Sequence, residues 1–169
     1  MGFTWYATAF DTDDAPFRLA LLAAMLAVLG LAAGVGGVAA GQAAGFALAY
    51  AALAAVLAGL YLRAWRQARA LRPYCARYGL SNLLGAALWL GSLLVPPPAR
   101  YGVWALAMLV LVAGPVLAVR AYAGQAYDSG HIPERYGLFT LIVLGESVVA
   151  VSAGTADAGW STPVALTAA

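Results

Sequence analysis

Five long apolar segments organise the chain, and glycine, proline or charged residues gather in the stretches between them. The segments cover about residues 17–35, 42–62, 78–95, 101–119 and 138–154. Each has about 17 to 21 residues, the length that an α-helix needs to cross the core of a bilayer. Apolar side chains fill every face of each segment, without the alternation of a transmembrane β-strand. The pattern predicts an all-α bundle of about five transmembrane helices in one membrane domain.

Glycine and proline mark the turns of this pattern. A glycine-rich stretch separates the first two segments, and the three prolines at 96–98 end the third because proline cannot continue a helix. Pro115 lies inside the fourth segment and is expected to kink it. Two pairs of glycines have the four-residue spacing that lets helix backbones approach closely: Gly30 with Gly34, and Gly41 with Gly45.

The composition supports a membrane protein and excludes several other classes. Of 169 residues, 64% are hydrophobic and 9% are charged, whereas a soluble domain has about 25% charged residues. The lipid bilayer is therefore the expected surroundings, and a basic stripe with stacking aromatics for nucleic acid is missing from the sequence. The single cysteine, Cys75, cannot form an internal disulfide or a thiolate cluster. We find no catalytic motif, and we expect no enzyme activity, cofactor or metal.

The basic residues, all arginines, predict an orientation. Eight of them fall in or beside the segment ends that share one side of the membrane, and Arg100 falls on the other side. By the positive-inside rule, the N-terminus and the loops at about 63–77 and 120–137 are cytoplasmic, and the C-terminus is outside. The eight are Arg18, Arg63, Arg66, Arg69, Arg72, Arg77, Arg120 and Arg135.

Glu146 is the main candidate functional residue. It lies eight residues after Leu138, or about 12 Å along a helix, near the midplane of a hydrocarbon core about 30 Å thick. A charge there costs roughly 2.5 to 3.5 kcal/mol. Gly145 and Ser147 flank it. We expect either a carboxylate that binds a proton or a cation, or one that holds helices together by hydrogen bonding.

Polar residues before the last segment form part of a predicted cytoplasmic mouth. They are His131, Glu134 and Arg135. A metal site at His131 and Glu134 is disfavoured because Pro133 is expected to keep Ile132 out of helical geometry. Pro133 instead suits the first turn of the last helix.

A second group of polar residues, Asp11, Asp13 and Asp14, precedes the first segment. These aspartates either cap the helix that follows Pro16 or form an acidic mouth that pairs with Arg18, Arg120 or Arg135.

Two stretches resemble signatures of the bacterial low temperature requirement A family. One is residues 131–147, HIPERYGLFTLIVLGES, and the other is residues 4–18, TWYATAFDTDDAPFR. The resemblance implies a multi-pass protein of the bacterial cell membrane. Family members have further spans on both sides and an acidic-aromatic motif near the N-terminus, which is absent here. The chain is therefore expected to be a central piece of the family fold or a short paralogue, with additional family helices or a second copy as partners.

The resemblance does not supply a molecular activity. Our leading expectation is movement of a small solute or ion with Glu146 on the path. The alternative is a non-catalytic membrane scaffold or a component of cold or stress adaptation.

Overall fold

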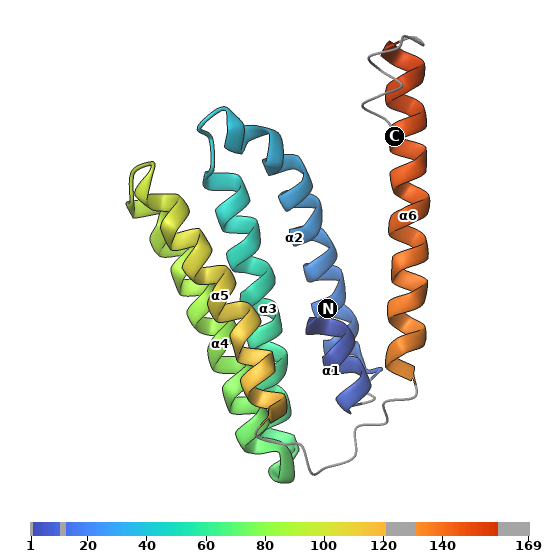
Figure 1. Ribbon diagram of the computed structural model, residues 1–169. Coiled ribbons are helices and arrows are strands. Elements are labelled where there is room, and N and C mark those ends of the chain that lie inside the picture. Colours follow the sequence, from blue (N-terminus) through green and yellow to red (C-terminus); the bar gives the residue numbers. More distant parts are fainter. Residues whose placement is uncertain (1, 11–12, 121–130, 159–169) are drawn as a thin grey trace. The chain divides into compact units, whose positions relative to one another are not determined.

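The computed structural model describes residues 2–10, 13–120 and 131–158, and it divides the chain into unit 1, residues 1–126, and unit 2, residues 127–169. Every regular element in these described ranges is helical, as expected (Figure 1). Unit 1 contains α1 Gly2–Phe10, α2 Ala15–Ala39, α3 Ala44–Gln67, η1 Arg69–Leu71, α4 Arg72–Gly91, η2 Ser92–Leu94 and α5 Ala99–Arg120. Unit 2 contains α6 His131–Ala158.

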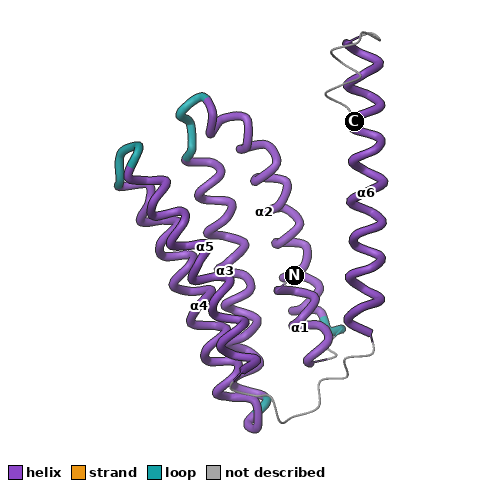
Figure 2. The backbone as a smooth tube through the Cα atoms, viewed as in Figure 1, coloured by secondary structure: helices purple, strands orange, loops and turns teal. Residues whose placement is uncertain are grey.

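In unit 1 the four long helices form an antiparallel bundle. Helix α3 packs between α2 and α4, α4 packs against α5, and the short α1 packs against α3. The turns at 40–43 and 95–98 lie together at one end of the bundle (Figure 2). The start of α2, the α3–α4 turn and the end of α5 lie at the other end. Most arginines of unit 1 belong to this second end, which we call the arginine end.

Three described helices are long and apolar enough to cross a membrane: Ala15–Val38, Ala44–Gln67 and Ala99–Ala118. The expectation of about five spans is therefore met in part. Helix α4 is more polar than its neighbours because Arg77, Ser81 and Asn82 lie in it, and the last two are buried. In α6 the side chains that the structure describes include the apolar stretch Gly137–Ala150, and the helix continues to Ala158.

The helices extend beyond the apolar segments, which corrects two expected boundaries. The interval 63–77 is not an irregular loop, because α3 continues to Gln67 and α4 begins at Arg72. Pro73 lies in the first turn of α4, where its missing N–H costs nothing. Helix α6 begins at His131, so the second part of the interval 120–137 is also helical.

Ile132 also differs from the expectation. Pro133 does lie in the first turn of α6, as expected, but Ile132 is helical too. The preference of a pre-proline residue for extended geometry does not prevent helical geometry at Ile132. His131 and Glu134 are therefore three residues apart in one helix.

Small residues allow the long helices to pack closely. A Cβ atom at Gly34 would lie 3.0 Å from the backbone nitrogen of Phe46, and one at Gly30 would lie 3.2 Å from the Cβ of Ala49. The glycine pair in α2 therefore faces α3. Gly41 instead serves a turn, with a positive φ of 80°, and a Cβ at Gly45 would meet open space.

Aromatic rings fill the bundle in two clusters. The tyrosine cluster lies towards the arginine end and joins α1, α2, α3 and α4; its members are Tyr6, Phe10, Phe17, Tyr61, Tyr74 and Tyr78. The tryptophan cluster lies towards the opposite end and joins α3, α4 and α5; its members are Phe46, Tyr50, Trp89, Tyr101 and Trp104. These clusters place the polar groups of the candidate site.

Candidate functional site: a bundle cavity and an ion-paired helix end

Asp14 joins two helices at the arginine end. Its Oδ1 accepts a hydrogen bond of 3.1 Å from the backbone N–H of Phe17, so it caps α2. The same oxygen accepts one of 3.0 Å from Nη1 of Arg63 in α3, and the second carboxylate oxygen pairs with Nη2. The bond from Arg63 is the main reason that the pKa of Asp14 lies below its ordinary value. The cap was expected, whereas the partner on α3 was not.

Asp13 pairs with Arg18 within the same stretch of chain. Arg18 donates from Nε at 3.0 Å and from Nη2 at 2.8 Å to the two carboxylate oxygens. The pairing lowers the pKa of Asp13. Both side chains are mostly exposed, at 76% and 68%, so this pair is a surface feature that stabilises little. Asp11 lies outside the described residues.

The tyrosine cluster lies beside the Asp14–Arg63 pair. Tyr6 of α1 and Tyr61 of α3 are 1% and 0% exposed, and their rings meet edge to face at 5.3 Å. Tyr61 stacks on Tyr78 of α4 with the ring centroids 4.1 Å apart. This packing closes the interior of the bundle towards the arginine end. Tyr6 of α1 is therefore part of the core of the bundle.

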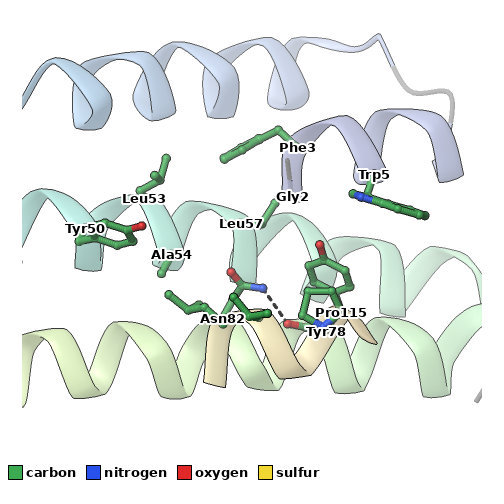
Figure 3. A pocket seen from close by; sticks show the side chains of 12 residues that line it. Gly2, Phe3, Trp5, Tyr50, Leu53, Ala54, Leu57, Tyr78, Asn82 and Pro115 are labelled. Atoms are coloured by element: carbon green, nitrogen blue, oxygen red, sulfur yellow. Dashed lines mark hydrogen bonds between the residues drawn. The ribbon is translucent and has the colours of Figure 1, made fainter. Parts of the chain in front are cut away.

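A cavity of about 340 Å³ lies on the far side of Tyr78, between α1, α3, α4 and α5. Its volume falls in the range of about 300 to 1,000 Å³ that small-molecule sites occupy. The wall is mainly apolar, and the side chains around it are drawn in Figure 3. The lining residues are Gly2, Phe3, Trp5, Tyr50, Leu53, Ala54, Leu57, Tyr78, Asn82, Leu111, Val112 and Pro115.

Asn82 is the main polar group of the cavity. It is 4% exposed, and its Nδ2 donates a hydrogen bond of 2.9 Å to the carbonyl oxygen of Tyr78 (Figure 3). The amide oxygen accepts no hydrogen bond from any described residue, so it is available to a donor in the cavity. Across the cavity, the Tyr50 hydroxyl lies 3.6 Å from Sδ of Met108. That weak bond leaves the hydroxyl able to exchange partners.

Pro115 lies inside α5 and changes its backbone hydrogen bonding beside this site. Because proline has no N–H, the carbonyl of Leu111 lacks its usual helical donor. Both residues line the cavity. Asn82 gives the cavity the kind of polar group that fixes the orientation of a small ligand in an apolar site. The sequence signalled Asn82 only as a polar residue in an apolar segment, and it did not reveal the cavity.

The motif around Glu146 lies in unit 2. The described side chains from 137 to 150 are exposed, as expected for a single helix considered by itself. Ser147 donates from Oγ to the carbonyl of Val143 at 2.7 Å and so bonds to its own helix. A Cβ at Gly145 would meet open space.

The other candidates of this region fall at the start of α6. The backbone at His131, Glu134 and Arg135 is helical, and their side chains lie outside the described residues. Among the residues that the structure describes, no three histidine, cysteine or carboxylate side chains are grouped to hold a metal ion.

The family model of the bacterial low temperature requirement A protein (LtrA) matches residues 1–169. The chain belongs to this family. No curated protein and no solved structure matches it. The match and the three apolar helices together make this LtrA-family member a membrane protein.

Proposed function

We propose that this LtrA-family protein moves a small solute or ion across the membrane, and that the solute binds in the cavity beside Asn82. The observation that carries the proposal is a buried amide whose oxygen faces an apolar cavity without a described donor. Polar groups at membrane depth are costly and usually mark a path or site. A structural role alone would favour a partner for both ends of the amide.

Glu146 is the second part of the proposal. Its helix is apolar from 138 to 144, and its carboxylate falls near the midplane if the helix crosses the bilayer. A carboxylate at that depth can take up and release a proton or hold a cation. We propose that Glu146 couples solute movement to such an ion, and that the arginine end faces the cytoplasm. We propose no enzymatic reaction.

Proton flux tests this proposal without knowledge of the solute. The full chain is reconstituted in vesicles that contain a trapped pH-sensitive dye, and a pH gradient is imposed. We expect a flux above protein-free vesicles, and we expect Glu146→Gln to remove most of it while the protein stays folded. Undiminished flux through Glu146→Gln, or no flux through the wild type, would reject the proposal.

The cavity needs a separate test. Asn82→Leu removes the amide and fills space, so it should reduce flux strongly. The matched control is Ser81→Ala, which changes the neighbouring buried polar residue of α4 that does not line this cavity. Equal loss in both variants would indicate damage to α4 and would count against a solute site at Asn82.

A non-catalytic scaffold is the second candidate, and the surface of α6 favours it. Large apolar side chains on this helix are exposed, including Leu141 at 67% and Val148 at 66%. Such a surface needs lipid or another helix to cover it. In this case Glu146→Gln should be nearly harmless, because the amide keeps its hydrogen bonds, whereas Glu146→Leu should weaken assembly with a second copy or with further family helices.

A further inference from the structure

A second opening lies on the outside of the bundle, between α4 and α5, away from the cavity beside Asn82. It has a volume of about 710 Å³. On α4 its lining residues follow the i, i+3, i+4, i+7 pattern from Arg77, and those on α5 follow the same pattern from Val110, so each helix contributes one face. The lining residues are Arg77, Leu80, Ser81, Leu84, Val110, Ala113, Gly114, Leu117 and Arg120. We call this opening the α4–α5 groove.

Charge is concentrated at one end of the α4–α5 groove. Arg77 of α4 and Arg120 of α5 both belong to the arginine end, and both side chains are exposed. Within the described part of the chain, the carboxylates that pair with arginine are Asp13 and Asp14, and their partners are Arg18 and Arg63. Neither arginine of the groove pairs with a described carboxylate. The groove thus joins two cations that have no described carboxylate partner to an apolar surface.

The length of the groove matches one leaflet of a bilayer. Val110 and Arg120 are ten residues apart on α5, or about 15 Å along the helix axis. Half of a hydrocarbon core about 30 Å thick is the same length. A headgroup at the arginines would therefore leave an acyl chain lying along Leu84, Ala113 and Leu117.

We propose that the α4–α5 groove binds an anionic phospholipid, with its phosphate between Arg77 and Arg120 and one acyl chain along the groove. Basic pockets between transmembrane helices suit such headgroups, and arginine binds phosphate oxygens in a bidentate manner. The close approach of Gly114 to Ser81 gives the groove its floor, because a Cβ at residue 114 would collide with the serine side chain.

Retention of lipid by the full chain tests the proposal. The purified protein is mixed in detergent with phosphatidylglycerol or with phosphatidylcholine of the same acyl chains, and bound lipid is counted by native mass spectrometry. The wild type should prefer phosphatidylglycerol. The variant Arg77→Gln/Arg120→Gln should bind it about 30-fold more weakly, from the usual attraction per basic residue at a membrane surface.

Two controls separate this site from a general basic surface. Arg66→Gln/Arg69→Gln removes two other exposed arginines of the same end and should leave retention unchanged. Arg77→Lys/Arg120→Lys keeps the charge and should restore most of the binding, which also guards against a folding defect. An equal loss in the Arg66/Arg69 variant, or equal retention of the two lipids by the wild type, would overturn the proposal.

The acyl chain has its own test. Ala113→Trp fills the α4–α5 groove at an exposed position without changing its charge. We expect it to reduce retention of phosphatidylglycerol at least tenfold. Unchanged retention would show that the lipid does not lie in the groove and would overturn the proposal.

Discussion

Unit 1 and unit 2 differ in how far the structure explains their sequence motifs. One of the two family-like motifs, residues 131–147, lies in α6, which forms a unit of its own. Unit 1 holds the other motif, residues 4–18, together with two aromatic clusters, a helix-to-helix ion pair and a cavity. In unit 1 the motif residues Tyr6, Asp14 and Phe17 take part in these contacts, so packing and pairing within the bundle explain them, whereas residues 131–147 are recognised from their sequence alone.

Truncation of a core aromatic side chain in unit 1 should cause the largest loss of stability. Trp89 is 2% exposed and stacks on Tyr50 at 4.4 Å. Trp89→Ala should destabilise the bundle by about 3 kcal/mol or more, because a large cavity remains. Thermal unfolding in detergent measures this. The matched change in unit 2 is Val149→Ala, at a side chain that is 64% exposed, and it should be nearly neutral. Comparable losses would show that α6 is packed as tightly as the bundle.

The second largest effect on stability is expected where α4 and α5 approach closely. Gly114→Val introduces side-chain atoms where Ser81 of α4 already lies, and overpacking costs about 1 to 3 kcal/mol. The control Gly102→Val is on the same helix, where a Cβ meets open space. Both variants are compared by thermal unfolding in the same detergent. If Gly102→Val is as damaging as Gly114→Val, the loss comes from valine in a helix and not from the contact with α4.

The Asp14–Arg63 pair should give a smaller effect that depends on pH. Asp14→Asn keeps a good capping residue but removes the charge. Because the folded pKa of Asp14 is lowered, its contribution is fully present above its ordinary pKa of about 4. That contribution is lost as the pH falls through the lowered value. The melting temperature of the variant should therefore be lower than wild type at pH 7, and the gap should close in acid.

Asp13→Asn provides the comparison for this pair, since its exposed partner Arg18 lies on the same stretch of chain. We expect a change in melting temperature too small to resolve. A larger effect for Asp13→Asn than for Asp14→Asn would contradict the view that the helix-to-helix pair matters more.

The smallest effect on stability is expected in unit 2. Glu146→Gln keeps the shape of an exposed side chain, so the unfolding free energy should change by less than about 0.5 kcal/mol. Proton flux should nevertheless fall. A loss of flux without a loss of stability would sharpen the contrast between the units. Undiminished flux in Glu146→Gln together with a marked loss of stability in Glu146→Leu, measured by the same thermal unfolding, would place Glu146 in a packing role instead.

Local features of the fold were predictable from the sequence because short-range physics determines them. The cap at Asp14, the early prolines of α2 and α6 and the long apolar helices follow from backbone hydrogen bonding and hydropathy. The helix boundaries around 63–77 were harder to predict, because arginines end an apolar segment without ending a helix. Ile132 shows the same limit, because it is helical although it precedes a proline.

The candidate site was predictable only in part. A capping role and a charge-pairing role for the aspartates do not exclude each other. Asp14 caps α2 and also pairs with Arg63. Antiparallel α2 and α3 bring these residues to one end, and a count of arginines per segment end was the available signal. Asn82 could not be distinguished from Ser81, which lies next to it but outside the cavity.

The sequence by itself determined that this chain is a helical membrane protein of the LtrA family, with a carboxylate in its last apolar segment. The tertiary structure decided which faces of those helices meet, and hence the buried Tyr6, the Asp14–Arg63 pair, the cavity at Asn82 and the groove ending at Arg77 and Arg120. The reason is that lipid tails are as apolar as leucine, so hydropathy does not separate the inner face of a membrane helix from its outer face.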